Sequence, residues 1–399
     1  MTTSPFMRLA FFNYGCPVGP FALQLALGLA AAGMAVDFFY DEAHMPAADV
    51  KNYRRVPNLR LIRLEVPIQR PATHRECLLR LEWLQKAFHA ACKAPYAVLV
   101  GIEKAGVALA AMIAETLCIP HIHWSLELYF AGNPGWMNWT PCGDFWLEAE
   151  ANAHKSALAV IIQDEDRASV LRAAMGHEGR YLYLPVAINA ANVQQRGGHA
   201  LHDLYGIDHS RKILLCYGNN RLPADWVLTM RDSLPEPWVL VLHGLYMSGL
   251  EGVPGDSRLI VSAARRPEAE IPALIASAHA GLVYYQADDI NQTLTAFASE
   301  KLARCLCAGI PVITSGIRNI HKLFAEQPCG ISISEPRQIA AALRTIEKNE
   351  DMFRKTAINA RRSYLFELAS REVIQFFSEL ACEGRTPDGG ASRNEAPRQ

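Results

Sequence analysis

The feature that most limits the fold is a repeated alternation of apolar strands with alanine- and leucine-rich helices. In the first half, strands are expected over residues 7–12, 34–40, 58–66, 96–102, 120–126, 158–163 and 180–186. Helices are expected between them, over residues 22–32, 76–92, 106–118, 146–157 and directly after Asp164. Continuously apolar strands are typical of parallel sheets buried on both faces. The alternation predicts a doubly wound parallel sheet, which binds ligands outside the carboxyl ends of its strands.

The same pattern starts again at "KILLCYG", residues 212–218. Further strands are expected over 238–244, 258–263 and 280–285, with helices over 224–234 and 268–278. Residues 297–316, "FASEKLARCLCAGIPVITSG", are typical of an amphipathic helix that passes through a Gly-Ile-Pro turn into a short apolar strand. Helices over 336–350 and 352–382 follow. A chain of 399 residues suits two domains, and we expect an α/β protein with two Rossmann-like halves.

Composition and charge exclude several classes of partner. The formal net charge is −1, which gives no long-range attraction for nucleic acid or an anionic membrane surface. The ten cysteines are scattered without a C-x-x-C pair, as in proteins of reducing compartments. The N-terminus lacks a signal-peptide pattern, and no apolar run is long enough to span a membrane. We expect a cytoplasmic protein without a transmembrane segment, for which a peripheral membrane contact stays open.

The last third of the chain resembles a known family. Lys301, Leu302, Ala308, Gly309 and the run 311–313 stand where glycosyltransferase family 4 carries "K-L-x-E-Y-x-A-x-G-x-P-V-I". The segments "CGISISEPRQIAAALRTI" and "FRKTAINARRSY" resemble the closing part of the same family. The whole layout, over roughly residues 7–382, looks like a divergent glycosyltransferase of the GT-B fold.

The resemblance implies a division of labour between two doubly wound domains that face a cleft. Residues 1–186 would form an acceptor-side domain and residues 209–360 a domain that binds a nucleotide-sugar. Residues 187–208 would be the linker, because they are polar and glycine-rich without a sustained period. Residues 361–382 would form a helix that crosses back to the first domain, as in the family. The polar residues 383–399 read as a disordered tail.

Lys301 is the first candidate for donor binding. A helix N-terminus has free N–H groups and a partial positive charge, both of which favour phosphate oxygens. A lysine there adds a mobile full charge. The alternative is an ordinary surface lysine on a helix. Matched to the family, Lys301 is expected to contact the donor diphosphate.

Arg304 breaks the family's pattern. Family members place a glutamate five residues before the motif glycine, where it accepts hydrogen bonds from the donor ribose; here that position holds Arg304. Arginine has no acceptor. Glu300 lies one helical turn earlier and is a partial substitute, while Arg304 suits a phosphate or a donor carboxylate. The change predicts either an altered donor contact or a lost one.

Other donor-binding positions carried over from the resemblance are glycines and one cation. Gly218 and Arg221 follow the first strand of the second half, in "YGNNR", and Gly244 follows the strand "WVLVLH". In the first half, Gly15 and Gly19 match a loop that lets the backbone approach the donor and the acceptor. Small residues there are also what a tight turn alone would need.

The segment "HWSLELY" lies where many relatives have a histidine and an aspartate facing the donor sugar. Glu127 stands near the carboxylate position and His123 precedes it. A carboxylate there suits a hydrogen bond to a sugar hydroxyl or general-base catalysis, so both residues are predicted to be catalytic. The alternative is a loop-capping Glu127 and a packed His123. Trp136 and Trp139 in the following loop are predicted to line the acceptor site, although aromatics also serve simply to pack a loop.

Two sequence patterns resemble metal-binding motifs, but another interpretation suits each of them better. Asp164 opens the triplet Asp-Glu-Asp after an apolar strand, but the next residues are helical, which favours an N-cap. His199 and His202 lack a third ligand with suitable spacing. We expect no metal and no cofactor, because helix dipoles and basic side chains serve the donor phosphates.

The resemblance therefore predicts a metal-independent glycosyltransferase. It would move a sugar from a nucleotide-sugar to a glycan, lipid-linked or small-molecule acceptor. The departure at Arg304 supports one alternative, a non-catalytic protein that senses nucleotide-sugars or partners an active transferase. A GT-B-like epimerase or phosphorylase is a second alternative, although the cofactor lysine motif of a phosphorylase is not found.

Overall fold

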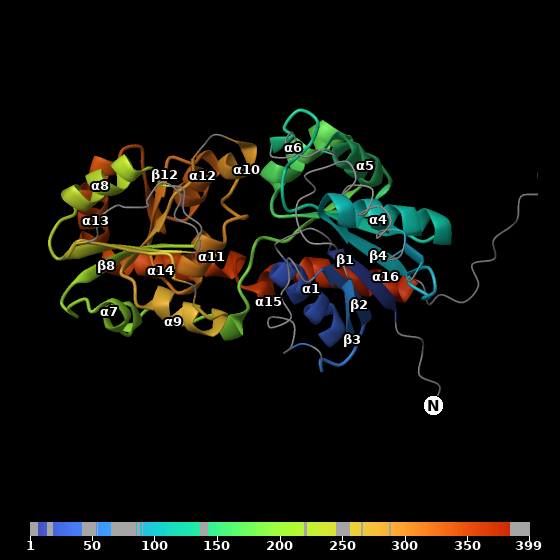
Figure 1. Ribbon diagram of the computed structural model, residues 1–399, viewed down its shortest axis with the longest axis horizontal. Coiled ribbons are helices and arrows are strands. Elements are labelled where there is room, and N and C mark those ends of the chain that lie inside the picture. The colour runs from blue at the N-terminus through green and yellow to red at the C-terminus, as the bar shows by residue number, and fades with distance from the viewer. Residues whose placement is uncertain are drawn as a thin grey trace, which may run out of the picture.

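The computed structural model describes most of the chain. The described residues are 7–13, 19–41, 53, 55–64, 85, 88, 89, 91–135, 143–218, 222–244, 256–264, 266–286 and 289–383. Within them the chain forms two parallel sheets with helices on their faces (Figure 1). None of the helices in this part of the chain has the length and apolar character needed to span a bilayer.

The first sheet has seven strands in the order β3-β2-β1-β4-β5-β6-β7. Its strands are β1 (Arg8–Asn13), β2 (Ala35–Asp41), β3 (Leu59–Leu64), β4 (Val98–Ile102), β5 (His121–Trp124), β6 (Ala159–Ile162) and β7 (Arg180–Tyr183). Every neighbouring pair is parallel, for instance β1 with β2 and with β4. The strand order reverses between β1 and β4, which makes their carboxyl ends the ligand-binding edge expected for this architecture.

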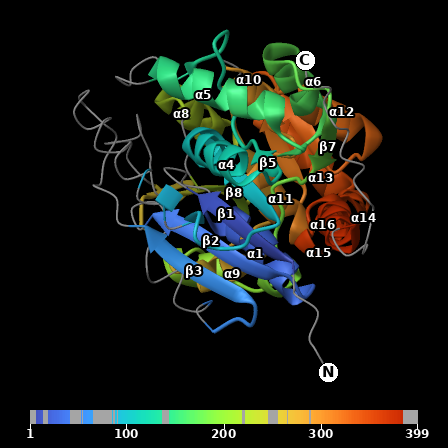
Figure 2. The ribbon, with the colours of Figure 1, turned by 90° about the vertical axis from the view of Figure 1, so that its right-hand side faces the viewer.

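Helices cover both faces of the first sheet because its strands carry apolar side chains on both faces. Leu9 and Phe11 pack on α1 (Gly19–Ala31), whereas Ala10 and Phe12 face α4 (Glu103–Leu117). Figure 2 shows α1 on one side of the strands and α4 on the other. The described part of this half also contains α5 (Gly143–Ser156) and α6 (Glu165–Met175).

The second sheet has six strands in the order β10-β9-β8-β11-β12-β13, and its order reverses between β8 and β11. Its strands are β8 (Lys212–Tyr217), β9 (Trp238–His243), β10 (Leu259–Ser262), β11 (Ala280–Val283), β12 (Val312–Ser315) and β13 (Gly330–Ile333). Its helices are α8 (Ala224–Ser233), α9 (Ile271–Ala276), α10 (Ile290–Thr293), α11 (Glu300–Cys307), α12 (Arg318–Glu326), α13 (Ile339–Lys348) and α14 (Glu350–Ala360). Two buried clusters on opposite faces form its core.

Two segments cross between the domains and pair with each other. The outgoing chain at Ile188 donates to Tyr364 O (2.8 Å) and accepts from Phe366 N (3.0 Å) on the returning chain. The Tyr364 hydroxyl also donates to Ala296 O at 3.0 Å. Beyond this crossing, α16 (Arg371–Glu383) packs with the first domain through Val373 and other apolar residues, while α14 stays with the second (Figure 1).

The end of the chain differs from the sequence-based expectation. One helix was predicted over 352–382, but the structure breaks it into α14, a 3-10 turn, α15 (Phe366–Ala369) and α16. The physical reason is the crossing: the backbone groups near Tyr364 bond to Ile188 instead of continuing a helix. The segment 187–208, expected as linker, also contains α7 (Ala200–Tyr205), whose Leu201 is fully buried in the second core.

A buried polar network lies beneath the first sheet's carboxyl edge. His123 Nδ1 lies 2.8 Å from His154 Nδ1, and His123 Nε2 lies 3.3 Å from Glu150 Oε1. Glu150 in turn pairs with Lys104 at 3.2 Å. Burial disfavours the charged imidazole and lowers the pKa of His123 to about 3 and that of His154 to about 2. Both rings are therefore neutral in the folded protein near neutral pH.

These histidines predict a loss of stability in mild acid. Above pH 6.5 both rings are neutral in the folded and the unfolded chain, whereas below it only the unfolded chain takes up the protons. Each ring should lower the free energy of unfolding by on the order of 1 kcal/mol per pH unit below that point. The unfolding temperature, measured by calorimetry from pH 8 to pH 5, should fall below pH 6.5 and fall less steeply in His123→Gln. Equal slopes in the two proteins would contradict this assignment.

Candidate functional site

Glu127 lies in a loop that follows β5, at the carboxyl edge of the first sheet. The loop is held by Glu103, whose Oε1 accepts from Leu126 N (2.6 Å) and from Glu127 N (2.9 Å). Glu103 itself has a φ of 56°, a left-handed conformation that costs a non-glycine residue free energy and is concentrated at functional sites. The local backbone is thus built to fix residues 126 and 127.

The Glu127 carboxylate faces the second domain. Glu127 is an exposed residue, but the protein atoms packed around its carboxylate disfavour the charged form and raise its pKa to about 7. Glu103 and Asp289, the latter from the second domain, raise the pKa further, while Arg167 and Lys104 oppose them. A carboxyl with a pKa near neutrality is suited to exchange protons at physiological pH.

His123 does not share this position. It is fully buried, and its two ring nitrogens are directed at His154 and Glu150. Its contacts are those of a packed side chain, the alternative that the sequence left open.

Lys301 lies at the start of α11, where the second sheet reverses its strand order. Ser299 caps the helix, and its Oγ accepts from Leu302 N at 3.1 Å. The Lys301 side chain runs past Gly218: a Cβ at that glycine would lie 3.7 Å from Lys301 Cε. Its Nζ lies 5.1 Å from the centroid of the Tyr285 ring. Burial lowers the pKa of Lys301, with Cys216 and Glu300 opposing the shift.

Gly218 and Gly244 lie together at the ends of β8 and β9. Gly218 has a φ of 86°, which a side chain rarely tolerates. At Gly244 a Cβ would stand 2.0 Å from Gly218 O, so the two backbones require glycine there. The structure therefore brings together Gly218, Gly244 and Lys301, three of the residues predicted for donor binding.

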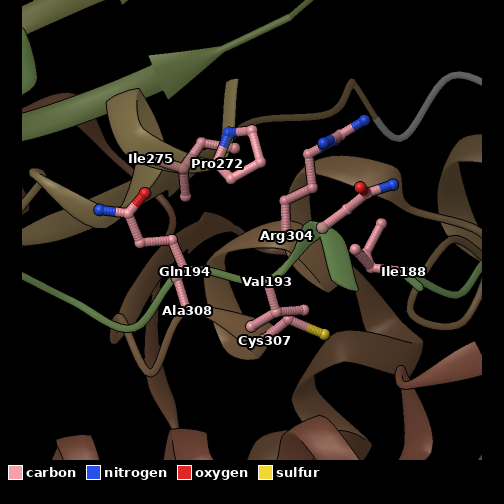
Figure 3. A pocket seen from close by; sticks show the side chains of 9 residues that line it. Ile188, Val193, Gln194, Pro272, Ile275, Arg304, Cys307 and Ala308 are labelled. Atoms are coloured by element: carbon pink, nitrogen blue, oxygen red, sulfur yellow. The ribbon is translucent and has the colours of Figure 1, made fainter. Parts of the chain in front are cut away.

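Arg304 is occupied by two carboxylates. Its Nε donates to Glu300 Oε1 (2.7 Å) and its Nη2 donates to Glu268 Oε1 (2.5 Å). Burial alone would lower the pKa of Arg304, but the two glutamates outweigh it and raise the pKa. Arg304 also borders a small pocket between α11, α9 and residues 188–194, and its guanidinium points away from Cys307 and Ala308 (Figure 3). Glu300 and Arg304 thus form an ion-paired cluster with Glu268.

The remaining predicted positions are distributed as follows. Gly19 begins α1. Asp164 is confirmed as the N-cap of α6, since its Oδ1 accepts from Arg167 N at 2.8 Å. Among the described residues, no three histidine, cysteine, aspartate or glutamate side chains are arranged to hold a metal ion. Four predicted positions lie outside the described residues: Gly15, Trp136, Trp139 and Arg221.

Sequence reasoning missed five residues around the candidate site. Glu103, Arg167 and Asn291 hold the Glu127 loop, and Glu268 pairs with Arg304. Asp289, the N-cap of α10, carries a pattern that could have been found, because a carboxylate directly before a short helix is an N-cap signal. The others act through contacts between residues distant in the chain, such as Leu128 with Asn291, which no local pattern reveals.

Comparison with solved structures decides the fold. Sucrose-phosphate synthase from Thermosynechococcus elongatus superposes with a TM-score of 0.69 at 17% identity, over 94% of this chain and 100% of that one. A glycosyltransferase from Rickettsia africae gives a TM-score of 0.68 at 10% identity, over 94% of this chain and 99% of that one. The chain has the GT-B fold.

Another GT-B neighbour is Anabaena HepE, with a TM-score of 0.65 at 14% identity over 94% of this chain and 100% of that one. That protein was solved in complex with UDP and glucose. No protein-family model and no curated protein sequence matches this chain. The relationship to these GT-B proteins is therefore one of fold.

The ion-paired cluster of this GT-B domain predicts that Arg304 contributes to stability. Its side chain is only 9% exposed, and Arg304→Ala would leave two carboxylates without their counter-charge. Because Glu268 and Glu300 are themselves partly hydrated, we expect a loss of about 1–3 kcal/mol. Chemical denaturation followed by circular dichroism measures it, with Arg354→Ala, an exposed arginine of α14, as the control. Equal stability of the two variants would show that the cluster contributes nothing.

Proposed function

We propose that this protein is a glycosyltransferase, a divergent relative of glycosyltransferase family 4, that takes its sugar from a nucleotide-sugar donor. The observation that supports it most is the placement of Lys301 beside Gly218 at the strand-order reversal of the second sheet. Parallel α/β sheets bind ligands at that point. The Glu127 carboxylate of the other domain is close enough to affect the pKa of Tyr285, the residue that Lys301 contacts.

The donor diphosphate is assigned to Lys301 and the N-terminus of α11. The lysine supplies a full positive charge and the helix start a partial one, and both stabilise negative charge on phosphate oxygens. The two tightly packed glycines, Gly218 and Gly244, let the ends of β8 and β9 approach closely at the same edge, where a side chain would clash. In this proposal these groups balance the charge of the leaving diphosphate without a protein-bound metal or another cofactor.

Glu127 is assigned to the acceptor. In the transfer, the bond between the anomeric carbon and the phosphate oxygen breaks, and its electron pair leaves with the nucleoside diphosphate. The acceptor oxygen forms the new glycosidic bond and releases its proton to the Glu127 carboxylate. A pKa of about 7 lets the carboxylate accept that proton near neutral pH.

The acceptor is proposed to be a hydroxyl of a glycan, a lipid-linked sugar or a small molecule, in the cytoplasm. The described cysteines are all free thiols, consistent with a reducing compartment.

Donor binding is tested with a panel of UDP-glucose, UDP-N-acetylglucosamine and GDP-mannose. At least one should raise the unfolding temperature, and Lys301→Ala should weaken its binding by about 10- to 100-fold, since a charged hydrogen bond contributes about 1.5–3 kcal/mol. Lys355→Ala, an exposed lysine of α14, is the matched control and should bind normally. If a broad panel of nucleotide-sugars gives no stabilisation, the proposed function is wrong.

The role of Glu127 predicts a pH dependence of turnover. Because only the deprotonated carboxylate accepts a proton, kcat for the donor that binds should rise with pH through an apparent pKa near 7. Glu127→Gln should reduce kcat by about 10²- to 10⁴-fold and remove that step from the profile. Initial rates of nucleoside diphosphate release between pH 5.5 and pH 9 provide the measurement. An unchanged profile in the variant would exclude Glu127 as the base.

A further inference from the structure

The loop that carries Glu127 is held by hydrogen bonds from both domains. From its own domain, Glu103 binds the N–H groups of Leu126 and Glu127 at 2.6 and 2.9 Å. On the far side of Glu127, Leu128 N donates to Asn291 Oδ1 at 2.7 Å. Asn291 belongs to α10 of the second domain. The backbone on both sides of the proposed base is therefore fixed, but by different domains.

Arg167 joins the two halves of this arrangement. Its Nη2 donates to Leu126 O (2.6 Å) and to Asn291 Oδ1 (3.0 Å), and its Nη1 donates to Leu294 O (3.1 Å). The residue is 1% exposed, so its guanidinium is bonded to the loop on one side and to the second domain on the other. A buried cation needs such partners, because an unpaired one is strongly disfavoured. Any separation of the domains would break the bonds to Asn291 and Leu294.

Asn291 makes its contacts at this position through its side-chain oxygen. Oδ1 accepts from two donors, Leu128 N and Arg167 Nη2, whereas Nδ2 is buried without a hydrogen-bond partner within the described structure. Burying an amide N–H without a partner costs free energy. The two hydrogen bonds to Oδ1 are therefore the interactions that favour an asparagine at this position. Asn319 of α12 is a close counterpart: its Oδ1 accepts from Ala296 N at 3.1 Å and its Nδ2 is likewise buried without a partner there.

We propose that Asn291, together with Arg167, positions Glu127 across the domain boundary, so that the proposed base takes its working position only when the two domains are closed. Asn291 and Arg167 are positioning residues, since they act on the backbone of the loop and not on substrate. The inference rests on the proposed function for the role of Glu127, but not for the hold on the loop. The helix that carries Asn291, α10, connects the two domains in a second way. Its N-cap is Asp289, whose charge raises the pKa of Glu127.

The groups that face Glu127 decide which variants are informative. They are Glu103, Lys104, Tyr129, Arg167, Tyr285 and Asp289. Asn291→Ala removes the acceptor and adds no charge. Asn291→Asp keeps an acceptor for both donors and adds a negative charge beside this group. A positioning role predicts that Asn291→Ala releases the loop and lowers activity. It predicts that Asn291→Asp keeps the loop in place while raising the pKa of Glu127.

Amide hydrogen exchange of the full chain, resolved over residues 126–129, tests the hold without any substrate. Exchange at Leu128 should accelerate at least tenfold in Asn291→Ala, remain near the wild-type rate in Asn291→Asp, and remain unchanged in the matched control Asn319→Ala. Wild-type protection in Asn291→Ala would overturn the proposal. Acceleration in both alanine variants would overturn it too, because it would indicate general loosening.

Turnover of the nucleotide-sugar that binds tests the consequence for Glu127. Asn291→Ala should lower kcat by 10- to 100-fold with KM for the donor within twofold of wild type, and Asn319→Ala should leave both unchanged. Asn291→Asp should recover most of kcat, with its pH profile moved to higher pH. A normal kcat in Asn291→Ala would overturn the positioning of Glu127. If no nucleotide-sugar binds, the proposed function fails, and the exchange rates still decide whether Asn291 holds the loop.

Discussion

The buried guanidinium of Arg167 is the interaction on which the relation between the two domains depends most. A cation with so little exposure needs oxygen partners, and those of its two terminal nitrogens come from both domains: Leu126 O from the first, Leu294 O and Asn291 Oδ1 from the second. Leu126 belongs to the loop that carries Glu127, and Asn291 belongs to α10, the short helix that follows Asp289. The carboxyl edges of the two sheets are thereby kept facing each other, which is the arrangement a two-substrate transfer between domains requires.

The secondary structure and the two parallel sheets could be predicted from the sequence because they rest on local patterns, whereas the GT-B fold was predicted from a family resemblance. Continuous apolar strands alternating with helices fixed two parallel sheets, and the neighbours of known structure confirm the GT-B fold. The end of the chain was less predictable. A helical pattern over 352–382 does not show that Tyr364 and Phe366 bond to Ile188, and this long-range pairing interrupts the helix.

The candidate site was predictable only in part, for the same physical reason. Gly218 and Gly244 directly follow the carboxyl ends of β8 and β9, a position that the sequence reveals, and the family motif indicated Lys301 at the start of α11. Arg304 had no such guide: it is paired with Glu268, 36 positions away, as well as with Glu300 one turn earlier. His123 looked chemically active but its burial lowers its pKa to about 3, so the ring is a neutral part of the core. Burial and long-range pairing are properties of the folded chain.

A crystal structure of the protein with UDP bound tests the central claim most directly. The account predicts the diphosphate at the start of α11, with a phosphate oxygen within about 3 Å of Lys301 Nζ, beside Gly218 and on the side that faces Glu127. A nucleotide bound elsewhere, with Lys301 making no contact to phosphate, would contradict it.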